Sequence, residues 1–188
     1  MTQPMTQSMP ASVAQPMTKV RVETAADITA IRHLNTAAFP TGAEARLVDA
    51  LRAAAGLVLS LVAEEGEVLV GHIAFSPVTV TAESGAVVTG VGLAPMAVAP
   101  FRQRTGVGRR LIEEGVRQLG AAGHRFCVVL GHPTYYPRHG FEVARSRDIR
   151  WERTVPDELF MVRALVPDGL DGVTGVVRYR PEFTSSEP

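Results

Sequence analysis

Residues 87–130 constrain the fold more than any other part of the chain, because they predict a strand, a turn, a helix and a strand in direct succession. The helix candidate, residues 106–122, is apolar on one face and charged on the other. Gly123 follows it as a typical helix-ending residue. The next strand candidate, residues 125–130, is short and apolar, as is typical of a buried strand that a helical crossover brings into parallel pairing. The sequence therefore predicts one β–α–β crossover.

The flanking segments predict mainly antiparallel structure. Residues 19–23 alternate polar and apolar side chains, as a strand does, and two short amphipathic helices follow. Strand candidates at residues 57–63 and 68–80 flank the turn-forming residues 64–67. Short strands and turns alternate after Phe141. We therefore expect an α+β fold with a mixed, mostly antiparallel central sheet that is flanked by helices and contains the single crossover.

The strand candidate at residues 87–98 has an unusual composition for the centre of a sheet. It contains Gly90, Gly92 and Pro95. We expect this strand to bulge or to let another backbone approach closely.

The length of the chain, 188 residues, fits one domain. Residues 1–18 contain little apolar surface and are expected to form a disordered leader, and they lack the regions of a secretory signal. We assign the globular domain to residues 19–183 and a short tail to residues 184–188. No apolar run approaches the roughly 20 residues of a membrane helix, so no membrane partner is expected.

Charge and cysteine content exclude several classes of protein. The chain has 19 basic and 19 acidic residues, so no overall field points to nucleic acid or to an anionic membrane. Cys127 is the only cysteine, which rules out an intramolecular disulfide and suits the cytoplasm. Its position within a strand candidate favours buried packing over use as a nucleophile. The five histidines show no zinc-binding spacing, so no metal site is expected.

The residues with the clearest chemistry are 103–108, which lie between the strand and helix candidates. Gly106 and Gly108 leave several backbone N–H groups unshielded at the start of the helix. The helix dipole adds partial positive charge there, so an anion such as a pyrophosphate is expected to bind. Four guanidinium groups suited to phosphate oxygens surround the loop: Arg102, Arg104, Arg109 and Arg110.

Two common phosphate-binding loops do not fit this segment. A Walker loop has Lys and then Ser or Thr after its second glycine, where this chain has Arg109 and Arg110. A dinucleotide-binding loop has a third glycine, where this chain has Leu111, and an acid after the next strand, where residues 131–133 read Gly-His-Pro. The simplest alternative is a plain strand-to-helix turn beside a basic helix face.

The loop resembles a known family. The coenzyme A-binding motif of the GNAT superfamily of N-acetyltransferases, Q/R-x-x-G-x-G/A, is matched by Val98-x-Pro100-x-x-Gln103-Arg104-x-Gly106-x-Gly108-x-x-Leu111. Tyr136, followed by Gly140 and Phe141, is similar to a later signature of that superfamily, Tyr-x-x-x-Gly-Phe. Residues 131–138 look more specifically like the YhbS-like branch of predicted acetyltransferases, as do residues 44–48 and 160–183.

The resemblance implies acetyl-coenzyme A (acetyl-CoA) as the co-substrate. In the superfamily, the strand before the loop splays from its parallel neighbour, and pantetheine fills the gap. Carried over, the backbones of Met96 and Val98 bind pantetheine, an N–H group near Met96 stabilises the oxyanion, and residues 103–109 hold the pyrophosphate. The implied cofactor-binding residues are Met96, Ala97, Val98, Gln103, Arg104, Thr105, Gly106, Val107, Gly108 and Arg109.

The resemblance also implies a general acid and leaves the general base open. Tyr136 is expected to protonate the departing thiolate, and Tyr135 to be a packing aromatic. Many relatives carry a glutamate on the strand before the loop, but residues 93–97 contain no carboxylate. Glu44 and His132 are the candidates for the base, and bulk water is a third. Glu44 also fits a helix-capping pattern, and His132 also fits a role in ordering its turn.

The predicted function is transfer of acetyl from acetyl-CoA to a primary amine of a small molecule, peptide or protein. The missing strand carboxylate keeps a non-catalytic acyl-CoA-binding or regulatory module as the alternative. A nucleic-acid-binding domain is a second rival, based on Arg145, Arg147, Arg150 and Arg153. We prefer to interpret those arginines as a solvated edge strand. Whether the chain forms a homodimer stays open.

Overall fold

The computed structural model describes residues 17–185. Within them, one sheet has the strand order β1-β2-β3-β4-β5-β8-β6, and β9 pairs with both β3 and β7. The strands are β1 Lys19–Val22, β2 Leu59–Glu65, β3 Val68–Thr81, β4 Val87–Val98, β5 Phe126–Leu130, β6 Glu142–Val143, β7 Ile149–Trp151, β8 Phe160–Ala164 and β9 Gly175–Arg178. The helices are α1 Ile28–Ala38, α2 Ala43–Ala53, α3 Val107–Ala121 and α4 Glu182–Ser185.

The sheet has the predicted mixture of directions. β4 pairs with β5, and β7 with β9, in parallel, whereas the other pairs of strands are antiparallel. The connection from β4 to β5 runs through α3. The predicted α+β fold with a β–α–β crossover is therefore confirmed.

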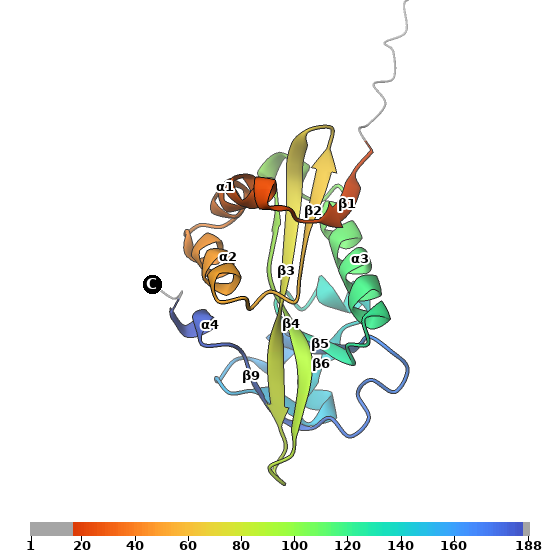
Figure 1. Ribbon diagram of the computed structural model, residues 1–188. Coiled ribbons are helices and arrows are strands. Elements are labelled where there is room, and N and C mark those ends of the chain that lie inside the picture. The colour runs from red at the N-terminus through yellow and green to blue at the C-terminus, as the bar shows by residue number, and fades with distance from the viewer. Residues whose placement is uncertain (1–16, 186–188) are drawn as a thin grey trace, which may run out of the picture.

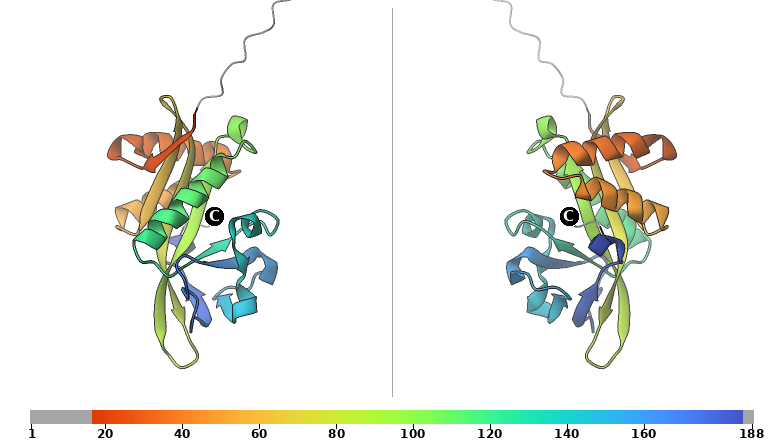
Figure 2. Two further views of the ribbon diagram at one scale, coloured as in Figure 1. Left: turned by 90° about the vertical axis from the view of Figure 1, so that its right-hand side faces the viewer. Right: turned by 90° about the vertical axis from the view of Figure 1, so that its left-hand side faces the viewer.

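Helices cover both faces of the sheet, with α1, α2 and α4 on one side and α3 on the other (Figures 1 and 2). On the α3 side, Leu111 packs into a cluster that includes Phe75 of β3. On the opposite side, Ile31 of α1 and Val48 of α2 meet Val62 of β2. Each central strand thus buries both of its faces, which fixes its register.

α3 ends where its glycine predicts. The N–H group of Gly123 donates to the carbonyl of Gly120 at 3.0 Å, and that of His124 donates to the carbonyl of Leu119 at 3.0 Å. These two bonds form a Schellman motif, with Gly123 in the left-handed region at φ 85°. The start of α3 belongs to the candidate site and is described there.

The hairpin between β2 and β3 is tighter than predicted. Glu64 and Glu65 were expected in the turn but lie in β2, where Glu65 pairs with Val68. Arg21 of β1 donates from Nε to Oε2 of Glu64 at 2.7 Å. The neighbouring edge strand therefore holds Glu64 in the sheet.

β4 bulges as its composition predicts. Ile73 pairs with Met96 and Phe75 with Leu93, so β4 has one extra residue in the Ala94-Pro95 region. The prediction about close approach needs a correction, because a side-chain ring rather than a backbone approaches Gly92. A Cβ atom on Gly92 would lie 2.4 Å from Cε1 of Tyr179.

Residues 1–16 of the predicted leader, 1–18, lie outside the described residues. The last two leader residues, Met17 and Thr18, are described. Thr18 donates from Oγ1 to Oε1 of Glu65 at 2.7 Å, so it is attached to the domain. Among residues 17–185, no helix is both long and apolar enough to cross a membrane.

A buried polar network ties α1 and α2 to the sheet. His72 of β3 is fully buried, with Nδ1 3.1 Å from Nδ2 of Asn35 and Nε2 3.0 Å from Oγ of Ser60. Nδ2 of Asn35 is a donor, so Nδ1 accepts and Nε2–H donates to Ser60. Ser60 bonds in turn to Glu23, whose carboxylate accepts two bonds from Arg52 of α2. The network holds the helical pair against β2 and β3.

The state of His72 predicts how stability depends on pH. Burial lowers the pKa of His72 to about 4, against the opposing effect of the Glu23 carboxylate. The unfolded chain has a histidine pKa of about 6.5, so it binds more protons than the folded chain between these values. Stability is therefore present above pH 6.5 and falls as the pH decreases towards 4, by up to about 3 kcal/mol.

Chemical denaturation of the wild type and of His72→Gln across this pH range measures the effect. The variant is expected to be less stable at neutral pH and to lack the histidine-linked decrease, so the two curves converge in acid. Parallel curves would show that His72 does not titrate on unfolding.

Candidate active site

The main cleft opens where β4 leaves β5. The two strands pair only from Val91 to Leu93 of β4, opposite Cys127 to Val129 of β5. β4 continues to Val98 along β3, and within residues 17–185 no strand pairs with its other edge past Leu93. A cleft of about 1370 Å³ lies at this divergence. The splayed strands implied by the resemblance are therefore present.

The loop before α3 forms one wall of this cleft. Gly106 is the N-cap of α3 and has φ 93°, a left-handed conformation that favours glycine. None of the backbone N–H groups from Arg104 to Arg109 donates a hydrogen bond within residues 17–185. Because these donors lie at the positive end of the helix dipole, the loop can bind an anion.

The four arginines predicted around the loop separate into two pairs. Arg104 and Arg109 line the cleft. Arg102 instead donates from Nη2 to Oε1 of Glu65 at 2.6 Å, and Arg110 approaches the Thr18 carbonyl at 3.5 Å. Two guanidinium groups, rather than four, therefore line the cleft beside the loop. That of Arg109 also donates from Nε to Oε1 of Glu113 at 2.7 Å.

The predicted cofactor-binding residues also divide. Those that line the cleft are Met96, Val98, Gln103, Arg104, Gly106, Gly108 and Arg109. Three do not line it: Ala97 and Val107 are buried, and the Thr105 hydroxyl donates to the carbonyl of Arg102 at 2.6 Å. Only the backbones of these three are available to a ligand, because packing or an internal hydrogen bond occupies their side chains.

Tyr136 lies in the cleft wall and is almost fully buried, with 7% exposed. Its ring packs against Gly131, where a Cβ atom would lie 2.2 Å from Cε2. Phe141 meets the same ring edge-on, with the centroids 5.6 Å apart. Burial raises the pKa of Tyr136 well above its usual value of 10, so the phenol carries its proton at neutral pH.

Tyr135 packs against the core, and it also lines the cleft. A Cβ atom on Gly108 would lie 2.6 Å from its hydroxyl, so this oxygen reaches the first turn of α3. The ring lies edge-on to Tyr136, with the centroids 5.2 Å apart. Tyr135 thus lines the cleft beside the anion-binding loop.

The two candidate bases both line the cleft. The capping interpretation of Glu44 is wrong, because the N-cap of α2 is Gly42 and Glu44 makes no capping bond. Its Oε2 atom is buried without a hydrogen-bond partner. His132 has an exposed side chain, and its carbonyl accepts from the N–H group of Tyr135 at 3.0 Å, so its backbone does order the turn.

This geometry matches a known family. Residues 19–144 match the acetyltransferase (GNAT) domain. The chain belongs to the GNAT acetyltransferase family. The predicted resemblance is therefore confirmed. The predicted enzyme class, an acyltransferase, is confirmed with it.

Individual relatives extend the match over most of the chain. The protein named uncharacterized N-acetyltransferase YhbS of Escherichia coli K12 is 40% identical over 166 residues, which are 87% of this chain and 97% of the relative. A crystal structure of E. coli YhbS in complex with CoA has a TM-score of 0.85 and 37% identity, over 95% of this chain and 96% of that one. A GNAT acetyltransferase from Brucella melitensis, in complex with acetyl-CoA, has a TM-score of 0.73 and 39% identity, over 90% of this chain and 99% of that one.

Two arginines of the predicted basic series, Arg145 and Arg150, line a second, smaller groove of about 750 Å³. Arg153 instead lines the main cleft, and Arg147 pairs with Glu142.

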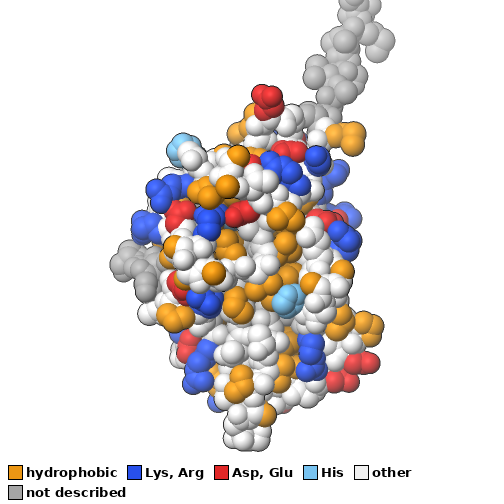
Figure 3. Space-filling view, in the orientation of Figure 1, with side chains coloured by type: hydrophobic (Ala, Val, Ile, Leu, Met, Phe, Trp, Pro, Cys, Tyr) orange, Lys and Arg blue, Asp and Glu red, His pale blue; other side chains and the backbone are white. Residues whose placement is uncertain are grey.

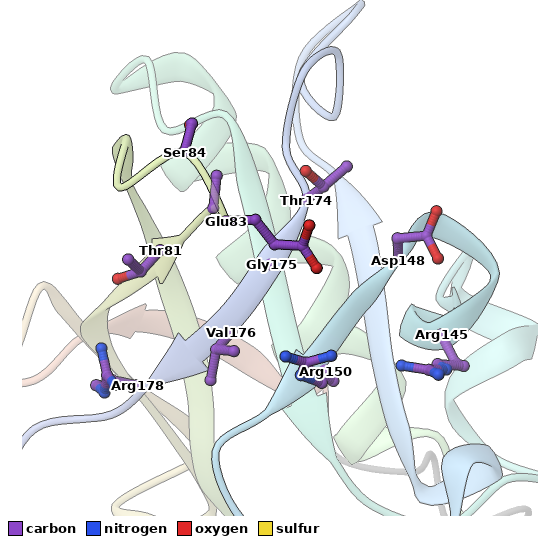
Figure 4. A pocket seen from close by; sticks show the side chains of 11 residues that line it. Thr81, Glu83, Ser84, Arg145, Asp148, Arg150, Thr174, Gly175, Val176 and Arg178 are labelled. Carbon is purple, nitrogen blue, oxygen red and sulfur yellow. The ribbon is translucent and has the colours of Figure 1, made fainter.

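Figure 4 shows Arg145, Arg150 and Arg178 in the second groove together with Glu83 and Asp148, so both charges are present. Basic side chains are similarly interspersed with acidic ones on the face seen in Figure 3. These surfaces do not form a uniformly basic stripe.

Neither a cysteine nucleophile nor a metal site is indicated within residues 17–185. Cys127 is fully buried, and burial raises the pKa of its thiol to about 12, so it stays protonated, as the packing interpretation predicts. Within residues 17–185, no group of three or more His, Cys, Asp or Glu side chains is placed to hold a metal ion.

Proposed function

We propose that this chain binds acetyl-CoA in the cleft between β4 and β5 and transfers the acetyl group to a primary amine by direct attack. The observation that carries the proposal is the run of unbonded N–H groups from Arg104 to Arg109 at the start of α3. They suit a pyrophosphate, and Arg104 and Arg109 add charge. Two of the solved relatives hold CoA or acetyl-CoA, in support of the same ligand here.

Pantetheine would lie along the free edge of β4. The backbone of residues 96–98 offers hydrogen-bonding groups there, beyond the last residue paired with β5. An N–H group near Met96 stabilises the negative charge that develops on the thioester oxygen. Because cofactor and amine share one cleft, the reaction also gains from their proximity.

The transfer needs several proton movements. Glu44 or His132 first removes a proton from the ammonium form of the acceptor, which frees the nitrogen lone pair. The lone pair attacks the thioester carbon, the carbon–sulfur bond breaks, and Tyr136 protonates the departing thiolate. The nitrogen then loses its second proton as the amide forms, and this proton restores the Tyr136 phenol. Tyr136 and both candidate bases line the same cleft as the loop. The single, buried thiol of Cys127 is consistent with work in the reducing cytoplasm.

Release of free thiol from acetyl-CoA, measured across a panel of small amines and peptides, tests this function. Amine-dependent release above the hydrolytic background is expected. Tight binding of acetyl-CoA with no release for any amine would instead support the non-catalytic alternative.

The general base is tested by the pH dependence of kcat/KM. If Glu44 accepts the proton, Glu44→Gln is expected to lower kcat/KM by a factor on the order of 10² and to remove the acidic limb of the profile. His132→Gln is the matched substitution at the other candidate and should then keep that limb. Wild-type profiles for both variants would contradict a protein base and point to bulk water.

A further inference from the structure

Among residues 17–185, the residues that line the main cleft carry three buried polar atoms without hydrogen-bond partners. They are Oε2 of Glu44, Nε1 of Trp151 and the hydroxyl of Tyr179. They come from α2, from β7 and from the segment after β9. An unpaired buried polar group costs about 1–3 kcal/mol, so three in one cleft indicate a ligand that pairs with them. The other unpaired atoms of this kind lie outside the cleft.

Aromatic packing holds two of these groups in place. The Trp151 ring stacks on Phe160 with the centroids 6.1 Å apart and meets Tyr179 edge-on at 5.9 Å. Tyr179 in turn contacts Phe183 of α4, with the centroids 4.7 Å apart. The indole N–H and the phenol are therefore fixed donors rather than mobile surface groups.

This cluster lies beside the expected position of the thioester. The Tyr179 ring packs on Gly92, next to the point at which β4 separates from β5. Tyr136 lines the same cleft. A molecule that pairs with Tyr179 would thus lie against the reacting end of the cofactor.

The three groups differ in what they can bind. A carboxylate such as Glu44 accepts hydrogen bonds and attracts an ammonium group, whereas the indole N–H of Trp151 only donates. The Arg153 guanidinium lies 5.2 Å over the Trp151 ring and adds positive charge on the donor side. Phe39 and Leu47 supply apolar wall. The cleft is therefore complementary to a molecule with an ammonium group, an apolar body and an accepting oxygen.

We infer that the acetyl acceptor is a small amine that carries a carboxylate or carbonyl oxygen, and that Trp151 and Tyr179 select for this oxygen. The inference rests on the proposed function and narrows its substrate class. Both residues act as specificity determinants, because they contact the part of the amine that does not react.

Three amines of matched shape test the inference: L-leucine, L-leucinamide and isopentylamine, which lacks the oxygen. The wild type is expected to prefer an oxygen-bearing amine to isopentylamine by a factor on the order of 10–100 in kcat/KM. Comparing leucine with leucinamide shows whether the site prefers a carboxylate or a neutral carbonyl oxygen. Tyr179→Phe keeps the ring and removes the hydroxyl, and Trp151→Phe keeps an aromatic side chain without the indole N–H. Each should reduce this ratio several-fold.

Arg150→Gln is the control, because Arg150 neighbours Trp151 on β7 but lines the second groove and not the main cleft. It should keep the wild-type ratio. Equal use of the three amines by the wild type, or an unchanged ratio in both aromatic variants, would overturn the inference.

Calorimetry of the same amines on CoA-saturated protein separates this inference from the proposed function. Selective binding of an oxygen-bearing amine without any thiol release would contradict the function and still support the selectivity. Thiol release with equal use of all three amines would support the proposed function and contradict the selectivity.

Discussion

Replacing Tyr136 with phenylalanine is expected to lower kcat by a factor on the order of 10²–10⁴, which is the usual loss when general acid catalysis is removed. The variant keeps the ring, so its packing against Gly131 and Phe141 should survive. Affinity for acetyl-CoA should therefore stay near that of the wild type. Turnover and pre-steady-state thiol release are both needed, because a thiol with a pKa near 8.5 leaves readily and its departure need not limit turnover.

Tyr135→Phe is the matched control for that experiment. Its hydroxyl lies over Gly108 at the loop, so its loss should affect acetyl-CoA binding more than kcat. Wild-type rates for Tyr136→Phe in both assays would remove Tyr136 from the mechanism. A larger loss of kcat in Tyr135→Phe would transfer the role of the acid to its neighbour.

Gly108→Val is expected to weaken acetyl-CoA binding by a factor on the order of 10–100. A side chain here enters the space between the first turn of α3 and the Tyr135 hydroxyl. It would keep the pyrophosphate from the backbone N–H groups, and each lost bond to a charged group is worth about 1.5–3 kcal/mol. Calorimetry measures the affinity, and thermal unfolding checks the fold. The smaller Gly108→Ala should lose less.

A second pair of variants separates the loop from backbone strain. Gly106 and Gly85 both have positive φ, 93° and 84°, and in both cases an added Cβ would meet nothing within 4 Å. Gly106→Ala and Gly85→Ala should thus impose similar strain, but only the first should reduce acetyl-CoA affinity. Unchanged affinity for Gly108→Val and Gly106→Ala would mean that the loop is an ordinary turn.

The parts of the site that sequence predicts well are those with local periodicity. The apolar residues of α3 recur every three or four positions, and Gly106 and Gly123 bound the helix. Its extent and its anion-binding end therefore follow from neighbouring residues. The splay of β4 was implied by the family resemblance, and its content of Gly90, Gly92 and Pro95 predicted an irregularity in that strand. These features need no knowledge of the rest of the chain.

The parts that sequence missed depend on distant packing or on competition between local patterns. Glu44 matches a capping pattern with Thr41, but the N-cap of α2 is Gly42, which leaves the Glu44 carboxylate free to face the cleft. Trp151 and Tyr179 meet because β7 pairs with β9, and no short-range signal predicts that pairing. The acceptor end of the site therefore emerges only from the tertiary structure.

Direct transfer from acetyl-CoA to an amine is the central claim, and a single-turnover experiment tests it most directly. Protein loaded with acetyl-CoA that is isotopically labelled in the acetyl group is mixed with an amine found to support thiol release. The reaction is quenched at short times, and mass spectrometry locates the label. The label is expected to pass from the thioester to the amine at the rate of thiol release, with none on the protein. Label that ends as free acetate, or that first appears on a protein side chain, would contradict direct transfer.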